Sequence, residues 1–258
     1  MDTALPLSCY IRTLNEARLV ATVVRAARQV ADEVIVVDSG STDDTAALAE
    51  AQGARVIRNP WPGNGFQKRV GEEAARHDWL LDLDADEAVS PELADSIRAL
   101  FRSEGPGGTV YALDLCLQPP GMEVWRDVFN VPRAKLYDRR AHRMPEHKVW
   151  DQLPGVSPKA VPCLDGALVH HAYRDLGHMV EKMNRGSTAR ARETRLRPIW
   201  ELWLRIWFGF PVYFSRQFFV KGAWRKGLYG AALCGVLSLS RWLRDAKQVE
   251  MHRARRRG

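Results

Sequence analysis

The chain has 258 residues, enough to bury the core of one large domain or of one domain with an appendage. Its formal net charge of +7 is unevenly divided, because residues 1–184 hold 21 Lys and Arg against 27 Asp and Glu, whereas residues 185–258 hold 17 against 4. A basic C-terminal part on an acidic body argues against a nucleic-acid-binding protein and favours a local contact with phosphate, lipid or a partner.

The first residues, MDTALPLSCYIRT, contain an acidic Asp2 and no apolar segment behind a basic one. They lack the pattern of a secretory signal peptide. We therefore expect a cytoplasmic protein.

Short apolar runs predict strands at 7–13, 33–39, 54–58 and 79–83. Between the first two strands, apolar residues recur at helical spacing: Leu19, Val20, Val23, Val24, Ala27 and Val30. Further helices are expected from about Thr42 and over about 65–75. Strands that alternate with helices predict an α/β fold with a mostly parallel, doubly wound sheet.

Ligands of such sheets bind beyond the carboxyl ends of the strands. Polar residues follow three of the predicted strands at that edge: Thr13, Asn15 and Glu16 after the first, Asp38 and Ser39 after the second, and Asp84 to Glu87 after the fourth. We expect these side chains to converge on one crevice.

The stretch DWLLDLDADEAVSPE runs from a buried strand directly into carboxylates. Asp84 and Asp86 are two residues apart, so in extended backbone both side chains would point the same way, within reach of one ion. Carboxylate oxygens favour Mg²⁺ or Mn²⁺. The alternative is a solvated turn before a helix that Ser90 caps and Pro91 begins.

Asp38 ends the second strand, in VVDSGSTDDT. A carboxylate there can accept from a ribose hydroxyl or a base N–H. In the alternative reading, Gly40 makes a turn and Ser41 or Thr42 caps the next helix. The chain has neither G-x-G-x-x-G nor G-x-x-x-x-G-K-[ST], which argues against nicotinamide and P-loop chemistry.

Four stretches, IRTLNEARLV, EVIVVDSGSTDDT, WPGNGFQKR and DWLLDLDADEAVSPEL, resemble the inverting family 2 glycosyltransferases with the GT-A fold. The resemblance is to the group that adds glucose or a similar sugar to the inner core of lipopolysaccharide. A fifth stretch, LVHHAYRDLGHMVEKMNRGST (168–188), is similar to a segment of the same group. The resemblance thus extends over about residues 7–190.

This resemblance implies a UDP-linked sugar donor and a bound Mg²⁺ or Mn²⁺. The residues that would line the nucleotide pocket are Thr13, Asn15, Glu16, Asp38, Lys68 and Asp84. Asp84 and Asp86 would hold the metal that carries the diphosphate. His170 would be a third metal ligand or would orient the diphosphate, and a hydrogen-bonded structural histidine is the alternative.

An inverting transferase also needs a carboxylate base. The family usually has H-E near this point, whereas this chain has MPEHKVWDQL, with Glu146 and His147 in reversed order and Asp151 further on. Either Glu146 or Asp151 is the expected base, and the alternative is that both are surface charges near Lys148. Two other departures are Arg69 after the QK of WPGNGFQKR, where the family often has Asn, and Lys135 in AKLYDRR.

From 109 to 168 the pattern indicates only mixed strands and loops, and a helix is expected over about 176–194. The following stretch, IWELWLRIWFGFPVYFSRQFFV (199–220), places Trp200, Trp203 and Trp207 on one helical face, with Pro211 expected to break or kink the helix. The uncharged run Leu228–Ser240 is shorter than the roughly 20 residues of a spanning helix.

Tryptophans and basic residues favour the interface and the anionic cytoplasmic leaflet of a membrane. We therefore expect an in-plane amphipathic anchor, which RARRR near the C-terminus would strengthen. The alternative is that these helices pack on the catalytic domain or form a homodimer.

The sequence thus predicts a GT-A catalytic domain over 1–195, with a nucleotide-binding half at about 1–105 and an acceptor half at about 106–195. A helical, aromatic-rich, membrane-associating extension is expected over 196–258. The expected function is transfer of a sugar, glucose by family analogy, from a UDP-sugar to a lipid-linked saccharide at the inner face of the cytoplasmic membrane. The alternatives are a sugar nucleotidyltransferase and a non-catalytic membrane-surface adaptor that binds nucleotide.

Overall fold

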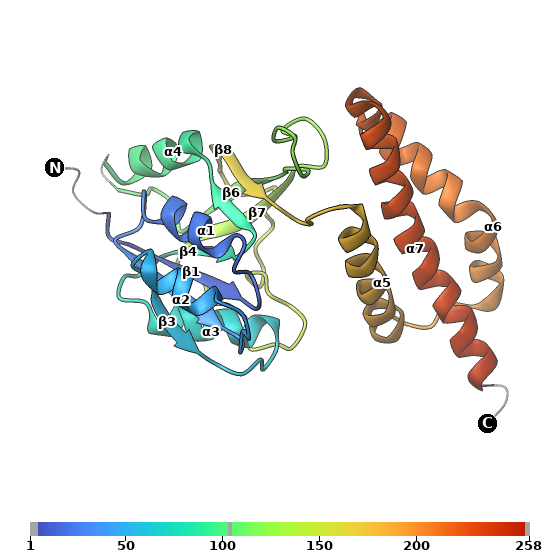
Figure 1. The fold of residues 1–258 in the computed structure, drawn as a ribbon, viewed down its shortest axis with the longest axis horizontal. Helices are drawn as coiled ribbons and strands as arrows, with labels where there is room; N and C mark the ends of the chain where they lie inside the picture. The colour runs from blue at the N-terminus through green and yellow to red at the C-terminus, as the bar shows by residue number, and fades with distance from the viewer. Residues whose placement is uncertain (1–4, 103–104, 256–258) are drawn as a thin grey trace. The chain divides into compact units, whose positions relative to one another are not determined.

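The computed structural model describes residues 5–102 and 105–255, so Asp2 and the last two arginines of RARRR lie outside the described residues. The chain forms two compact units (Figure 1). The first unit comprises Met1–Gln118, Val124–Arg126 and Asn130–His171, and the second comprises Pro119–Glu123, Asp127–Phe129 and Ala172–Gly258. The division after His171 lies nearer the N-terminus than the boundary expected after residue 195.

The N-terminal half of the first unit is a four-stranded parallel sheet in the order β3-β2-β1-β4. Its strands are β1 (Leu7–Thr13), β2 (Glu33–Asp38), β3 (Arg55–Arg58) and β4 (Trp79–Asp84). All four lie where the apolar runs predicted them. The register pairs Thr13 with Asp38 and Arg12 with Asp84, so the polar ends of three strands meet at one edge.

Four further strands extend this sheet in the order β4-β7-β6-β8-β5. They are β5 (Glu87–Val89), β6 (Val110–Leu117), β7 (Val131–Asp138) and β8 (Cys163–His170). β7 pairs antiparallel with β4 and β6, whereas β6 and β8 are parallel. The eight-stranded sheet is therefore mixed, and its parallel half carries the doubly wound arrangement that the sequence predicted.

Helices cover both faces of the sheet. They are α1 (Val20–Ala27), α2 (Thr45–Ala51), α3 (Asn64–Ala74) and α4 (Pro91–Arg102). The helix expected from about Thr42 begins three residues later, because residues 39–44 form the turn after β2. Ser90 caps α4 as expected, since its Oγ accepts the N–H of Leu93 at 3.2 Å.

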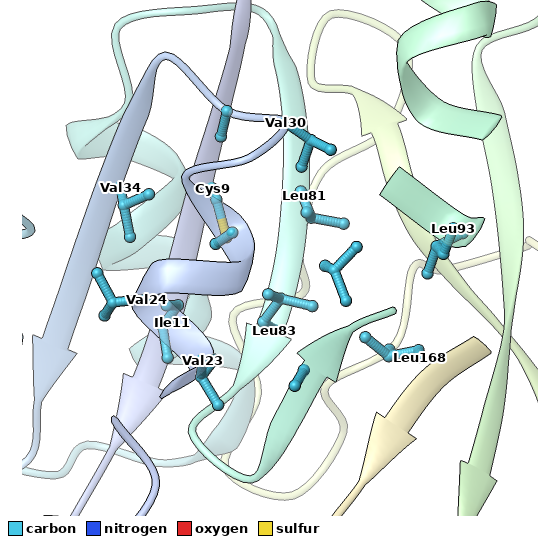
Figure 2. Packing of buried hydrophobic residues seen from close by; sticks show 14 of the residues in the cluster. Cys9, Ile11, Val23, Val24, Val30, Val34, Leu81, Leu83, Leu93 and Leu168 are labelled. Carbon is cyan, nitrogen blue, oxygen red and sulfur yellow. The ribbon is translucent and has the colours of Figure 1, made fainter. Parts of the chain in front are cut away.

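The core has one apolar layer on each face of the parallel strands. Figure 2 shows Val23 and Val24 of α1 over Cys9 and Ile11 of β1, in a cluster that also includes Leu93 of α4. The opposite face buries a second cluster around Tyr10, Ile35, Leu80 and Tyr137, against α3. Fully burying an aliphatic or Phe side chain contributes about 1.5–3 kcal/mol, so these layers hold the edge of the sheet in place.

The second unit consists mainly of helices. α5 (Leu176–Glu193) and α6 (Ile199–Ser215) pack along α7 (Gly227–Arg255) (Figure 1). A π-helical segment, η1 (Arg216–Val220), and a short 3-10 helix, η2 (Ala223–Lys226), connect α6 to α7. Lys247 of α7 donates to Asn184, Ser187 and Thr188 of α5, and Trp242 donates to the carbonyl of Ile206 at 3.0 Å.

The break expected at Pro211 is not observed, because α6 continues through this residue to Ser215. Proline lacks an N–H, so the carbonyl of Trp207 loses its helical donor. Trp207 is well exposed, and water can satisfy that carbonyl. Among the described residues, no helix combines the length and the apolar character that crossing a bilayer requires.

Candidate active site at the carboxyl ends of β1 and β4

The loops after β1 and β2 are tied together by hydrogen bonds. Asn15, which has a φ of +53°, accepts the N–H of Thr42 through its side chain at 2.8 Å and donates its own N–H to Ser41 Oγ at 2.9 Å. The N–H of Glu16 donates to Thr45 Oγ1 at 2.8 Å. The structure therefore places the expected nucleotide residues Asn15 and Glu16 on two interlocked loops.

Thr13 and Asp38 lie at the root of these loops. Thr13 Oγ1 is buried and has no hydrogen-bond partner within the described ranges. Both carboxylate oxygens of Asp38 accept the N–H of Ser41, at 3.2 and 3.0 Å, and one also accepts its hydroxyl. Asp38 thus closes the turn that contains Gly40. Neither Ser41 nor Thr42 caps the next helix as the alternative expected, because α2 begins at Thr45 with Asp44 at its N-cap. A carboxylate has about four acceptor positions, so one more donor can be accommodated there.

A buried cluster of charges lies at the end of β4. Lys68 of α3 is 3 % exposed, and its Nζ donates to Asp82 Oδ2 at 2.7 Å and lies 3.9 Å from Asp84. Lys135 of β7 donates to Glu87 Oε2 at 2.6 Å and lies 3.6 Å from Asp82. Glu87 also accepts the N–H of Asp84 at 2.9 Å, so it fixes the backbone at which the DADE turn begins.

Arg12 completes this cluster at the end of β1. Its guanidinium lies 2.8 Å from Asp84 Oδ1 and 3.3 Å from Asp151 Oδ2, and it lies over the ring of Trp61. The parallel pairing of β1 with β4 brings Arg12 beside Asp84. Arg12 and Asp82 were not predicted as site residues. A signal for Asp82 was available, because it lies two residues before Asp84 and therefore on the same face of the strand.

The surrounding charges determine the ionisation of the buried groups. Burial acts to raise the pKa of Asp84, but the positive charges of Lys68, Lys135 and Arg12 outweigh it and hold that pKa well below its usual range. Burial acts to lower the pKa of Lys135, but Asp82 and Glu87 outweigh it and hold that pKa above its usual range. Both groups are therefore charged at neutral pH.

These residues line a cavity of about 190 Å³ in the first unit. Its polar lining is Lys68, Asp82, Asp84, Glu87, Arg133, Lys135, Asp151, Gln152 and His170. Pockets for drug-sized ligands are about 300–1,000 Å³. The cavity is therefore suited to one part of a donor, such as the sugar and the adjoining phosphate, and not to a whole nucleotide sugar.

Asp86 and His170 form a second pair beside the cavity. β5 and β8 pair Glu87 with His170, and Asp86 Oδ2 lies 3.4 Å from His170 Nε2. The expectation of extended backbone between Asp84 and Asp86 was wrong, because Ala85 and Asp86 form the turn between β4 and β5. Asp84 contacts Arg12, Lys68 and Lys135, whereas Asp86 contacts His170.

The donor set at this pair fits a divalent cation. Two neighbouring ligands of an octahedral ion with bonds of about 2.0–2.1 Å are about 3 Å apart, close to the separation of Asp86 and His170. In the part of the chain that the structure describes, no three His, Cys, Asp or Glu side chains form a metal site. The protein would thus supply few ligands and leave positions for phosphate oxygens, as is usual for Mg²⁺.

The two candidate bases lie in different environments. Asp151 lines the cavity and lies 3.9 Å from Lys68 as well as 3.3 Å from Arg12. Glu146 is exposed and does not line the cavity. Glu146 is therefore a surface charge, as the alternative expected. The carboxylate of Asp151 instead lies in the cavity near Asp84, where it can accept a proton.

The loop over 145–151 is held against the start of α3. The N–H groups of Asn64 and Gly65 donate to the carbonyls of Lys148 and His147, both at 2.9 Å. A Cβ on Gly65 would lie 2.5 Å from the carbonyl oxygen of Trp150 and closer still to that of Pro145. Only glycine permits this approach, so the WPGNG motif positions Asp151.

His147 has a structural role within this loop. Its Nδ1 accepts the N–H groups of Val149 and Trp150, at 3.0 and 2.9 Å. The reversed order of Glu146 and His147 thus leaves a histidine that shapes the segment before Asp151.

Comparisons with known proteins identify the family of the chain. The family described as Glycosyl transferase family 2 matches residues 8–160. An uncharacterized glycosyltransferase of Rickettsia felis is 31% identical over an alignment of 262 positions, which covers 95% of this chain and 89% of that protein. The lipopolysaccharide core biosynthesis glycosyltransferase LpsC of Rhizobium meliloti is 28% identical over 98% of this chain and 95% of its own length.

Among solved structures, glucosyl-3-phosphoglycerate synthase from Mycobacterium tuberculosis, in complex with Mn²⁺, UDP and its product, superposes with a TM-score of 0.35. The two sequences are 28% identical over 42% of this chain and 43% of that one. The family match spans more than half of the chain, and near-full-length relatives are named glycosyltransferases. The chain therefore belongs to glycosyl transferase family 2.

Proposed function

We propose that the chain transfers a sugar, with glucose as the first candidate, from a UDP-linked donor to a lipid-linked saccharide acceptor. The reaction would belong to the synthesis of lipopolysaccharide core or a related cell-surface glycan, as the name of the Rhizobium relative suggests. The observation that carries the proposal is the convergence of Asp84, the Asp86–His170 pair and Asp151 on one cavity edge.

Asp86 and His170 would hold a Mg²⁺ or Mn²⁺ ion, with Asp84 beside it. When bound, such an ion neutralises charge on the departing diphosphate. Five carboxylates at this edge, Asp82, Asp84, Asp86, Glu87 and Asp151, face four cations, Arg12, Lys68, Arg133 and Lys135. The formal charge of the edge is therefore negative, which favours a bound cation.

The nucleotide would lie along the loops after β1 and β2. Thr13 Oγ1 and the remaining acceptor position of Asp38 face no other partner among the described residues, so they can bind the base or ribose. Asn15 and Glu16 would hold in place the loop after β1, which borders the nucleotide. Lys68 Nζ donates to Asp82 and lies 3.9 Å from both Asp84 and Asp151, so its role would be to hold the floor of the cavity in shape.

Asp151 would act as the base. It accepts the proton of the acceptor hydroxyl as that oxygen attacks the anomeric carbon from the face opposite the diphosphate, which inverts the configuration. Arg12 and Lys68 would orient its carboxylate. Trp150, which is 65% exposed and adjoins Asp151, offers an apolar surface to the incoming acceptor.

The second unit would bring the enzyme to its acceptor. Large apolar side chains are exposed along α6, among them Trp200, Trp203 and Trp207, and this part of the chain is strongly basic. Both features favour the interface of an anionic membrane. We therefore place the enzyme peripherally on the inner face of the cytoplasmic membrane, with a homodimer through the same helices as the alternative.

The test is incubation of the purified chain with UDP-glucose, Mn²⁺ and a truncated lipopolysaccharide acceptor that lacks the inner-core glucose. The proposal expects release of UDP and a product with inverted anomeric configuration by NMR. Release of pyrophosphate from UTP and glucose 1-phosphate, in a parallel incubation, would instead identify a nucleotidyltransferase. Binding of UDP without turnover of any UDP-sugar would identify the non-catalytic adaptor.

A further inference from the structure

The second unit contains a pocket between α6 and α7 that the transfer reaction does not use. Its volume is about 210 Å³. The lining residues are Arg205, Gly209, Val212, Tyr213, Arg216, Arg241, Trp242 and Asp245. Residues 205, 209, 212 and 216 follow one another at helical spacing, so one face of α6 forms one wall.

The arginines of this pocket differ in their pairing. Arg205 donates to Asp245 at 2.9 Å, and Arg244 donates to the same carboxylate at 3.0 Å. Asp245 is 2% exposed, so these two arginines neutralise its charge inside the pair of helices α6 and α7. Arg216 and Arg241 have no carboxylate partner in the ranges that the structure describes. The pocket therefore has a formal excess of two positive charges.

Arg241 is held in a defined orientation. Its guanidinium lies over the ring of Tyr213, 4.4 Å from the ring centroid, and the hydroxyl of Tyr213 accepts from Gln217 at 2.6 Å. Gln217 is 4% exposed, which fixes this chain of contacts in the helix packing. A stacked guanidinium keeps its N–H groups free at the edge, where they match the oxygens of a phosphate.

Exposed apolar side chains lie at the pocket and close to its lining residues in the chain, and together we call them its apolar rim. Val212 is 65% exposed and Phe208, one turn earlier on α6, is 56% exposed. Past the end of α6, Phe219 and Val220 are 63% and 80% exposed. A soluble phosphate would not need such a surround. An anionic phosphate attached to acyl chains would use both the charged pocket and the apolar rim.

We propose that this pocket binds the phosphate of an anionic membrane lipid, with Arg216 and Arg241 as its ligands and the α6 side chains in the membrane interface. The inference rests on the membrane contact of the proposed function and is independent of the sugar transfer. Beyond the general attraction of a basic surface to anionic lipids, the proposal assigns the binding of one phosphate to two specific arginines.

The test is sedimentation of the full chain with vesicles of phosphatidylcholine, with and without phosphatidylglycerol. Three double variants are compared with the parent: Arg216→Gln with Arg241→Gln, Arg216→Lys with Arg241→Lys, and Arg185→Gln with Arg192→Gln as a control. The control removes two exposed arginines of α5 that do not line the pocket, and it loses the same net charge. Thermal melting and UDP binding show that each variant is folded.

A contact driven only by net charge would weaken by up to about thirtyfold, and equally in both glutamine pairs. The site predicts at least about tenfold weaker binding to phosphatidylglycerol vesicles for the pocket pair than for the control. It also predicts that the lysine pair loses several-fold although its charge is unchanged, because lysine lacks the planar fork.

Equal losses in the pocket and control pairs, or full binding by the lysine pair, would overturn the site. Binding of soluble glycerol 3-phosphate through Arg216 and Arg241, without any effect of these residues on vesicle binding, would point to a soluble ligand and overturn the lipid assignment. None of these readouts uses sugar transfer, so failure here is distinguishable from failure of the proposed function.

Discussion

At the scale of single residues, Lys135 is the cation on which the buried carboxylates depend most. It is 5% exposed and lies between Glu87 and Asp82. Lys135→Met would leave the negative charges of Glu87 and Asp82 buried without the positive charge that offsets them. We expect the free energy of unfolding to fall by about 3–5 kcal/mol in urea denaturation.

The matched control for this experiment is Lys159→Met, because Lys159 is exposed on the same unit. It should change the free energy of unfolding by less than about 0.5 kcal/mol. A loss below about 1 kcal/mol for Lys135→Met would show that the carboxylates do not need this lysine.

The choice between the two candidate bases is also made at this scale. Asp151→Asn should lower kcat about 10²- to 10⁴-fold and leave UDP affinity within a few-fold, because the base contacts the acceptor and not the nucleotide. Glu146→Gln should stay near the parent in both quantities. Steady-state kinetics of UDP release measures this, and the opposite pattern would move the role of base to Glu146.

The sequence could predict the residues at the ends of strands, because apolar runs locate each strand. The polar residues that follow a parallel strand lie at the edge of the sheet where ligands bind. Thr13, Asp38 and Asp84 were found in this way. Arg12 and Lys135 were missed as site residues because their roles depend on which strands pair. The pairing of β7 with β4 across more than 50 residues leaves no local signal.

At the scale of elements, the start of α3 acts as a support for the loop over 145–151. In Gly65→Ala, the new Cβ would collide with backbone carbonyls, which cannot move aside as a flexible side chain can. We expect displacement of Asp151, a loss of about 1–3 kcal/mol in stability and a fall in kcat larger than the change in UDP affinity.

Gly107→Ala is the control for this variant. A Cβ at Gly107 meets nothing within 4 Å, and its φ is not positive. Stability and kcat should remain at the level of the parent. If Gly65→Ala behaved like Gly107→Ala, the loop would not be held by this contact.

Periodicity predicted the helices and parallel strands well because each needs only local information. The turn between β4 and β5 was expected only in the alternative reading, since its two residues follow a strand without a glycine or proline to mark the turn. Its shape is set by Glu87, which binds the N–H of Asp84 and the side chain of Lys135. Long-range contacts thus decide which way Asp84 and Asp86 point.

At the scale of the whole molecule, charge and chemistry are divided between two parts of the chain. The acidic first part holds the cavity, and the residues from 185 onward carry a large positive excess. Salt screens exposed charges far more than buried ones. Binding to anionic vesicles should therefore fall steeply as NaCl rises from low to physiological concentration.

UDP binding with Mn²⁺ should change much less over the same range, because its ligands are largely buried. Vesicle sedimentation and calorimetry on one preparation compare the two. Vesicle binding that does not respond to salt would show that apolar contacts alone attach the second unit.

A divalent cation at Asp86 and His170 would join the protein to the diphosphate of the donor. Calorimetry of UDP with and without Mn²⁺, on the parent chain and on Asp86→Ala, tests this role. We expect at least about tenfold tighter binding with Mn²⁺ for the parent and loss of that gain in the variant. Equal affinity in all four titrations, or no binding of UDP at all, would show that no such cation joins the two.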